Sequence, residues 1–167
     1  DGRLIWMLDG YTTTSRYPYS DPVRDVSNFN YIRNSVKVTV DAYDGAVSFY
    51  LADPSDPIVR AYSAAFPGLL KPLDQMPEGL RRHIRYPEDF FTIQARKYAT
   101  YHMLDPQVFY NKEDLWAVPR RPIEGRDREM EPYYTIMRMP GEQNEEFILL
   151  TLFNPARRDN MIAWMAA

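Results

Sequence analysis

The chain has 167 residues, of which 45% are hydrophobic, 14% aromatic and 26% charged, with a formal net charge of −3. This composition excludes an intrinsically disordered chain and fits a folded protein of about one domain. The acidic balance disfavours a nucleic-acid partner, and the absence of cysteine excludes disulfides, thiolate catalysis and cysteine metal sites. No apolar run approaches the ~20 residues that cross a bilayer, so we do not expect this segment to span a membrane.

The first predicted strand is "RLIWML", which is apolar without alternation and therefore typical of a strand covered on both faces, by helices or by a neighbouring domain. The stretch "DGYTTTSRYPYS" follows, and its β-branched threonines and proline favour an extended arm. Tyr11, Tyr17 and Tyr19 are candidates for docking on another domain or stacking on a sugar ring. Arg16 is a candidate anion ligand, and a purely structural arm is the favoured alternative.

The clearest signal is a β-hairpin over residues 36–51, because Asp44-Gly45 is the pair that a two-residue type I′ turn prefers. This turn predicts that Tyr43 lies opposite Ala46 and that Val40 lies opposite Phe49. One face of the hairpin then gathers seven apolar side chains: Val36, Val38, Val40, Ala42, Val47, Phe49 and Leu51. The other face is polar and carries Asp41, a further candidate for ligand binding.

Helical periodicity follows the hairpin. Asp56 as N-cap and Pro57 at the first helical position predict a short helix, and residues 86–103 predict the longest one. Weaker signals indicate helices over residues 77–84 and 158–167. The arginine- and acid-rich residues 120–131 show no apolar periodicity, so we expect an exposed loop there.

A second antiparallel pair is predicted over residues 133–153, with Pro140, Gly141 and Asn144 in its loop. The elements together predict an α+β fold: a mainly antiparallel sheet of about five strands with two β-hairpins, packed against three to four short helices. We expect residues 1–167 to form a single domain cut from a larger protein, because no signal pattern opens the chain.

Dedicated catalytic and cofactor motifs are absent from the sequence, so we assign no catalytic residue and no cofactor. Only two histidines occur, and His102 with Asp105 is a weak candidate for half of a metal site. No second nitrogen ligand lies nearby in the sequence, so a packed, hydrogen-bonded histidine is the favoured interpretation. Each acidic residue near a proline or a turn has a structural explanation as a cap.

Several long strings carry a family resemblance: "DGRLIWMLDGYTTTSRYPYS", "VKVTVDAYDGAVSFYLADPSDPI", "FPGLLKPLDQMP", "TYHMLDPQVFYNKEDLW" and "RDNMIAW". In this order they resemble the large bacterial membrane proteins of uncharacterised protein family 0182. The resemblance implies a multi-pass membrane protein of which this chain is one soluble domain, on the extracytoplasmic side. It implies no activity, so no functional residue is carried over.

The leading hypothesis is a non-catalytic domain that serves interdomain packing, assembly or recognition of a partner, with the rest of the parent membrane protein as its first partner. The alternative is an envelope enzyme or ligand-binding module that acts on a glycan or another anionic cell-surface polymer. Its warrant is the tyrosine, threonine and arginine content of residues 9–20, together with the acids on the polar face of the hairpin.

Overall fold

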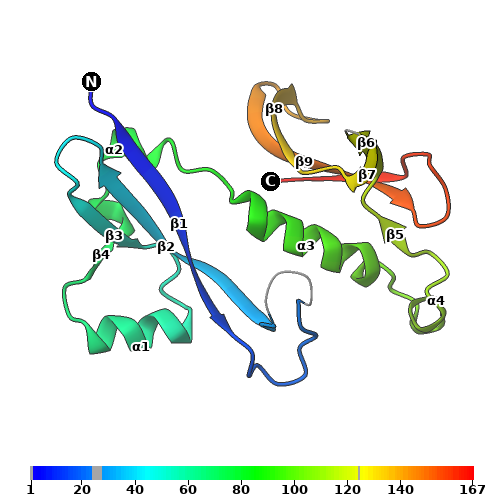
Figure 1. The fold of residues 1–167 in the computed structure, drawn as a ribbon, viewed down its shortest axis with the longest axis horizontal. Coiled ribbons are helices and arrows are strands. Elements are labelled where there is room, and N and C mark those ends of the chain that lie inside the picture. The colour runs from blue at the N-terminus through cyan, green and yellow to red at the C-terminus, as the bar shows by residue number, and fades with distance from the viewer. Residues whose placement is uncertain (1, 24–27, 124) are drawn as a thin grey trace. The chain divides into compact units, whose positions relative to one another are not determined.

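The computed structural model describes residues 2–23, 28–123 and 125–167. The chain divides into two compact units, an N-terminal unit (Asp1–Arg85) and a C-terminal unit (Tyr86–Ala167). That residues 1–167 form one domain stays a prediction. Each unit combines helices with antiparallel strands, so the predicted α+β class is confirmed (Figure 1). The described strands are divided between three sheets rather than gathered in one.

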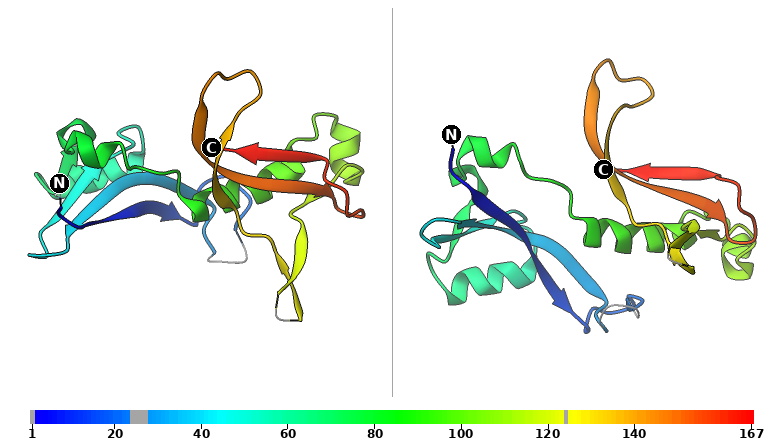
Figure 2. Two further views of the ribbon diagram at one scale, coloured as in Figure 1. Left: turned by 90° about the horizontal axis from the view of Figure 1, so that it is seen from above. Right: turned by 45° about the horizontal axis from the view of Figure 1, so that its top comes forward.

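The N-terminal unit is built on a four-stranded sheet with the order β1-β2-β3-β4. Its strands are β1 (Ile5–Thr14), β2 (Tyr31–Asp41), β3 (Val47–Leu51) and β4 (Leu70–Pro72). The first three are antiparallel, and β4 runs parallel to β3. The helices of this unit are α1 (Pro57–Ala65), the 3₁₀ turn η1 (Leu73–Gln75) and α2 (Glu78–Arg81). Helix α1 lies along one side of the sheet (Figures 1 and 2).

The predicted hairpin is present as β2–β3, but its predicted register is wrong by two residues. Val40 lies opposite Val47, and Val38 lies opposite Phe49. The turn is longer than expected because Asp41 and Asp44 accept hydrogen bonds from the backbone N–H groups of Tyr43 and Ala46, each at 2.9 Å. A shift of two residues keeps every side chain on its face, so the predicted separation into an apolar and a polar face is confirmed.

The C-terminal unit is organised around the long strand β9 (Glu145–Pro155), which pairs with three other strands. These are β5 (Trp116–Ala117), β8 (Tyr133–Arg138) and β10 (Ala163–Ala166). Helix α3 (Glu88–Tyr101) packs on this sheet through Ala95 and Ala99, which form a buried core with Phe153. Ile148, Leu149 and Leu150 are all buried, as expected for a strand covered on both faces.

The predicted helices α1, α2 and α3 are confirmed, and α3 is the longest. The helix predicted at the C-terminus is wrong, because that segment forms β10 and pairs with β9, so tertiary pairing overrides a weak helical signal. The segment 120–131 is mostly exposed where described, and it forms a hairpin of β6 (Arg120–Ile123) and β7 (Arg126–Glu129). Helix α4 (Pro106–Asn111) precedes β5. Within the described ranges, no helix has the length and hydropathy needed to cross a membrane.

Candidate functional site

The most distinctive surface of the N-terminal unit is an apolar sheet face whose side chains are exposed or only partly buried. Cross-strand pairing places seven side chains on this outer apolar face: Trp6, Leu8, Val36, Val38, Val40, Val47 and Phe49. None of the seven is buried, and Trp6, Leu8 and Val47 are 63%, 52% and 50% exposed. Large contiguous apolar surface of this kind marks an interaction site on a folded protein.

The opposite, inner face of the same sheet is polar and yet buried. Ser35, Lys37 and Thr39 alternate along β2 with the outer valines, and all three are buried. Lys37 forms an ion pair with Asp9 on β1. The inner face is therefore stabilised by paired polar groups under the helices, which leaves the apolar side of the sheet outermost.

Asp56 is the anchor of this buried polar layer. Its carboxylate is 1% exposed and accepts hydrogen bonds from the hydroxyls of Thr12, Ser35 and Tyr31, at 2.5, 2.5 and 2.7 Å. It also caps α1 by accepting from the backbone N–H of Ile58 at 3.0 Å. One side chain thus ties the helix to two strands.

The pKa of Asp56 reflects these contacts. Burial favours the neutral acid, but the hydrogen bonds from Ser35, Thr12 and Tyr31, together with the Ile58 amide, outweigh burial and lower the pKa to about 2. The carboxylate is therefore ionised at neutral pH without a cation among its hydrogen-bond donors. This arrangement is a structural anchor, because every acceptor position is filled by the protein itself.

The candidate residues of the tyrosine-rich arm lie at the end of β1 and just beyond it. Tyr11 is a half-buried residue of β1, next to a β-bulge. Arg16 is exposed, and Tyr17 stacks on Tyr31 with ring centroids 5.3 Å apart. Tyr19 is fully exposed and adopts a positive φ of 57°, an uncommon conformation for a residue with a side chain.

The structure separates Asp41 from this arm. Asp41 pairs with Ile5 at the start of β1, whereas Thr14, at the end of β1, pairs with Tyr31. Nine residue steps along a strand correspond to roughly 30 Å. Arg3 instead forms an ion pair with Asp41, and its hydrogen bond is the main reason that the pKa of Asp41 is lowered.

His102 and Asp105 have different partners in the C-terminal unit. The ring of His102 stacks on that of Trp116, with the ring centroids 3.6 Å apart. The Nε2 atom of His102 lies 3.5 Å from a carboxylate oxygen of Asp114. Asp105 caps α4 by accepting from the N–H groups of Gln107 and Val108, at 2.8 and 3.0 Å. Each residue thus has a local structural role, and no cluster of three metal-ligating side chains occurs among the described residues.

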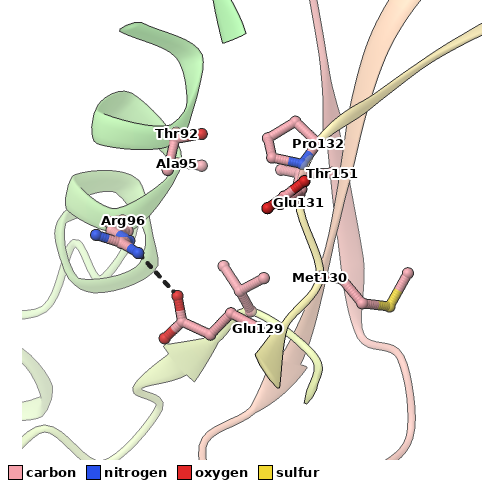
Figure 3. Close-up of a pocket in the computed structure, with 9 residues that line it drawn as sticks. Thr92, Ala95, Arg96, Glu129, Met130, Glu131, Pro132 and Thr151 are labelled. Atoms are coloured by element: carbon pink, nitrogen blue, oxygen red, sulfur yellow. Dashed lines mark hydrogen bonds and ion pairs between the residues drawn. The ribbon is translucent and has the colours of Figure 1, made fainter. Parts of the chain in front are cut away.

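A small pocket lies between α3 and the sheet of the C-terminal unit (Figure 3). Its volume is about 230 Å³, and an ion pair of 2.9 Å joins Arg96 of α3 to Glu129 of β7 at its side. Thr92 and Glu131 also line it (Figure 3). Ligand pockets usually measure about 300–1,000 Å³, so the volume of this pocket lies just below the usual range.

Sequence reasoning did not single out Trp6 and Leu8, although a signal was available. The unalternating string "RLIWML" indicated a strand covered on both faces. In the structure this strand, β1, leaves Trp6 and Leu8 exposed on the outer apolar face. The fold therefore defines a two-unit α+β region whose N-terminal unit presents a partly exposed apolar sheet face.

The chain belongs to the Uncharacterised protein family UPF0182, whose model matches residues 1–167. It is 58% identical over 167 residues to a UPF0182 protein of Pelotomaculum thermopropionicum, covering all of this chain and 18% of that protein. A UPF0182 protein of Desulforamulus reducens is 54% identical over 99% of this chain and 18% of its own length. A UPF0182 protein of Nostoc is 55% identical over 100% of this chain and 16% of its own length.

The chain therefore spans less than a fifth of the length of these curated relatives. No solved structure matches it.

Proposed function

We propose that this region is a non-catalytic packing domain, whose outer apolar face binds other parts of the same large polypeptide. The observation that carries the proposal is the exposure of Trp6, Leu8 and Val47 on one continuous sheet face. Burying an exposed aromatic or aliphatic side chain contributes roughly 1.5–3 kcal/mol. Burial of these three exposed side chains, which adjoin four partly buried apolar ones, therefore gives a substantial free-energy gain on association.

The total accessible surface supports the same proposal. The chain exposes 12168 Å² for a mass of 19.7 kDa. A single globular protein of this mass exposes about 8,600 Å², and two separate globular units of half the mass expose about 10,400 Å² together. Contact between units only lowers the total, so the division into two units does not account for the excess. An excess of this kind is expected of a region that packs against further protein.

The relatives are long enough to contain further polypeptide that packs against this surface. The chain matches them at 54–58% identity but covers only 16–18% of their length. More than four fifths of each relative therefore lies outside this region. The non-catalytic role is supported by the described acids, since Asp41, Asp56 and Asp105 each serve an ion pair or a cap.

The experiment compares polar substitutions on and off the outer apolar face in the full-length protein. Trp6→Ser and Leu8→Ser should each reduce the yield of folded protein and lower its melting temperature. Tyr110→Ser is the matched control, because Tyr110 is highly exposed outside this face, in the C-terminal unit. Equal behaviour of Trp6→Ser and Tyr110→Ser would contradict the proposal.

The membrane location and the extracytoplasmic side belong to the same proposal and rest on the family resemblance of the sequence. The chain has no cysteine, so a single cysteine at the exposed Tyr19 provides a clean probe in a full-length protein freed of other cysteines. A membrane-impermeant maleimide should label Tyr19→Cys in intact cells. Labelling only after the cells are lysed would place the region in the cytoplasm.

The alternative, recognition of a glycan or another anionic envelope polymer, is favoured by the exposed arm. Tyr17 and Tyr19 offer aromatic faces for a sugar ring, and Arg16 lies between β1 and these tyrosines in the sequence. Binding of envelope polysaccharide that disappears in Tyr17→Ala and Tyr19→Ala, but persists in Tyr110→Ala, would support this function. Absence of binding by the unsubstituted protein would contradict it.

A further inference from the structure

The two edges of the N-terminal sheet are built differently. The edge strand β4 has only three residues and carries Lys71 and Pro72, and short strands, lysine and proline are devices that prevent further pairing at an edge. The other edge strand, β1, has ten residues, with neither proline nor lysine. A β-bulge interrupts β1 only after Gly10, so its first half, Ile5–Asp9, remains regular.

The hydrogen-bond pattern shows which groups of β1 point to the open edge. The carbonyl oxygen of Leu4 accepts from the N–H of Ala42 at 3.1 Å, so position 4 directs its backbone towards β2. Antiparallel strands alternate bonded and non-bonded pairs, and the register from Ile5 to Gly10 is unbroken. Trp6 and Leu8 therefore bond to β2, whereas Ile5, Met7 and Asp9 direct their N–H and C=O groups away from it.

We propose that β1 receives an additional β-strand along Ile5–Asp9, supplied by a part of the same polypeptide outside these 167 residues. This inference rests on the proposed function and specifies how the packing is achieved. An added strand satisfies the outward backbone groups and also covers the margin of the outer apolar face, where Trp6 and Leu8 are exposed. One element thus accounts for both features of β1.

The surroundings of β1 specify the side chains of the added strand. Its residues on the outer side contact Trp6 and Leu8, so they should be apolar. Its residues on the inner side face a cavity of about 130 Å³ whose lining includes Asp9, Lys37 and Arg85. Charged side chains line this cavity, with Lys37 paired to Asp9, so the inner-side residues of the added strand should be polar. The partner is therefore an alternating strand, apolar on one side and polar on the other.

The source of the strand follows from the lengths of the relatives. The chain covers 16–18% of their sequences, so each relative contains more than four times as much polypeptide outside this region as inside it. A strand from the same molecule acts at a high effective concentration and needs no separate partner. A second copy of the protein is the other source, and the test below distinguishes it.

The test is residue-resolved hydrogen–deuterium exchange on the full-length protein. The amides of Trp6 and Leu8 are internal controls, because they bond to β2 whether or not a strand is added. The proposal predicts that the amides of Ile5, Met7 and Asp9 exchange at least 100-fold more slowly than unstructured amides, at every protein concentration. Rapid exchange at these three positions, with Trp6 and Leu8 protected, would overturn it. Protection that disappears on dilution would also overturn it, in favour of a second copy.

The failure of this inference is distinguishable from failure of the proposed function. Oxidative footprinting reports on side chains, so it shows whether Trp6 is covered regardless of backbone pairing. If Trp6 is protected from oxidation while the amides of Ile5, Met7 and Asp9 exchange rapidly, the proposed interdomain packing stands and strand addition is excluded.

Proline substitution provides a second readout. Met7→Pro removes an N–H group that points to the open edge, whereas Leu8→Pro removes a hydrogen bond to β2. The proposal predicts that both variants lower the melting temperature of the full-length protein, and an unchanged melting temperature for Met7→Pro would overturn it.

Discussion

Replacing Asp56 tests whether the buried polar layer holds the N-terminal unit together. In Asp56→Ala the cap of α1 is lost, which costs about 1 kcal/mol. The hydroxyls of Thr12 and Ser35 lose their shared acceptor, and a buried donor without a partner costs about 1–3 kcal/mol. Because the two hydroxyls are 3.2 Å apart and can bond to each other, we expect a total loss of about 3 kcal/mol.

Because Asp56 is ionised in the folded chain, its contribution to the free energy of unfolding depends on pH. Its pKa is about 2 in the folded chain, against 3.8 for an unperturbed aspartate. The folded pKa is depressed, so the stabilisation is complete above pH 4 and is lost as the pH falls towards 2. A difference of this size corresponds to about 2 kcal/mol. Asp56→Asn keeps a good capping oxygen but has no charge, so it should retain α1 and lose this part of the pH dependence.

The assay is urea unfolding of the 167-residue chain, followed by circular dichroism at pH 7 and at intervals from pH 4.5 to 2.5. Unfolding of the two units is followed separately if two transitions appear. The expected order of stability at pH 7 is wild type, then Asp56→Asn, then Asp56→Ala. A loss below 0.5 kcal/mol in Asp56→Ala, or an unchanged pH slope in Asp56→Asn, would refute the reasoning.

Two further substitutions test the core and the hairpin turn. Phe153→Ala should lower the free energy of unfolding by about 3–5 kcal/mol, because Phe153 is completely buried. Phe147→Ala, at a half-exposed position, should lower it much less. Equal urea midpoints for the two variants would contradict this prediction. Gly45 has a φ of +71° in the turn between β2 and β3, so Gly45→Ala should destabilise by about 1 kcal/mol. Gly79→Ala, in α2 with open space around it, should be neutral or stabilising, and the reverse order in thermal unfolding would contradict this prediction.

Features set by neighbouring residues were predictable from the sequence. Asp56 followed by Pro57 correctly marked the start of α1, because capping depends on a few adjacent backbone groups. The β2–β3 hairpin was predicted for the same reason. The register of this hairpin was not predicted. The preference of Asp44-Gly45 for a two-residue turn competes with the hydrogen bonds that the turn N–H groups of Tyr43 and Ala46 donate to the carboxylates of Asp41 and Asp44.

Features set by distant contacts were not predictable. Nothing near Ser35 or Lys37 indicates that the polar side of the sheet is the buried one, because the acceptor for Ser35 is Asp56 and the partner of Lys37 is Asp9. Likewise, β10 has the composition of a short helix and becomes a strand only through pairing with β9. The exposure of Trp6 depends on which elements cover the sheet.

The most direct test of the account is the solvent accessibility of Trp6 in the full-length protein, measured by hydroxyl-radical footprinting and mass spectrometry. Tyr110 is the reference, because it is highly exposed and lies outside the outer apolar face. If this face packs against the rest of the polypeptide, Trp6 should be oxidised at least tenfold more slowly in the full-length protein than in the 167-residue chain, with Tyr110 less affected. Equal oxidation of Trp6 in the two proteins would contradict the central claim.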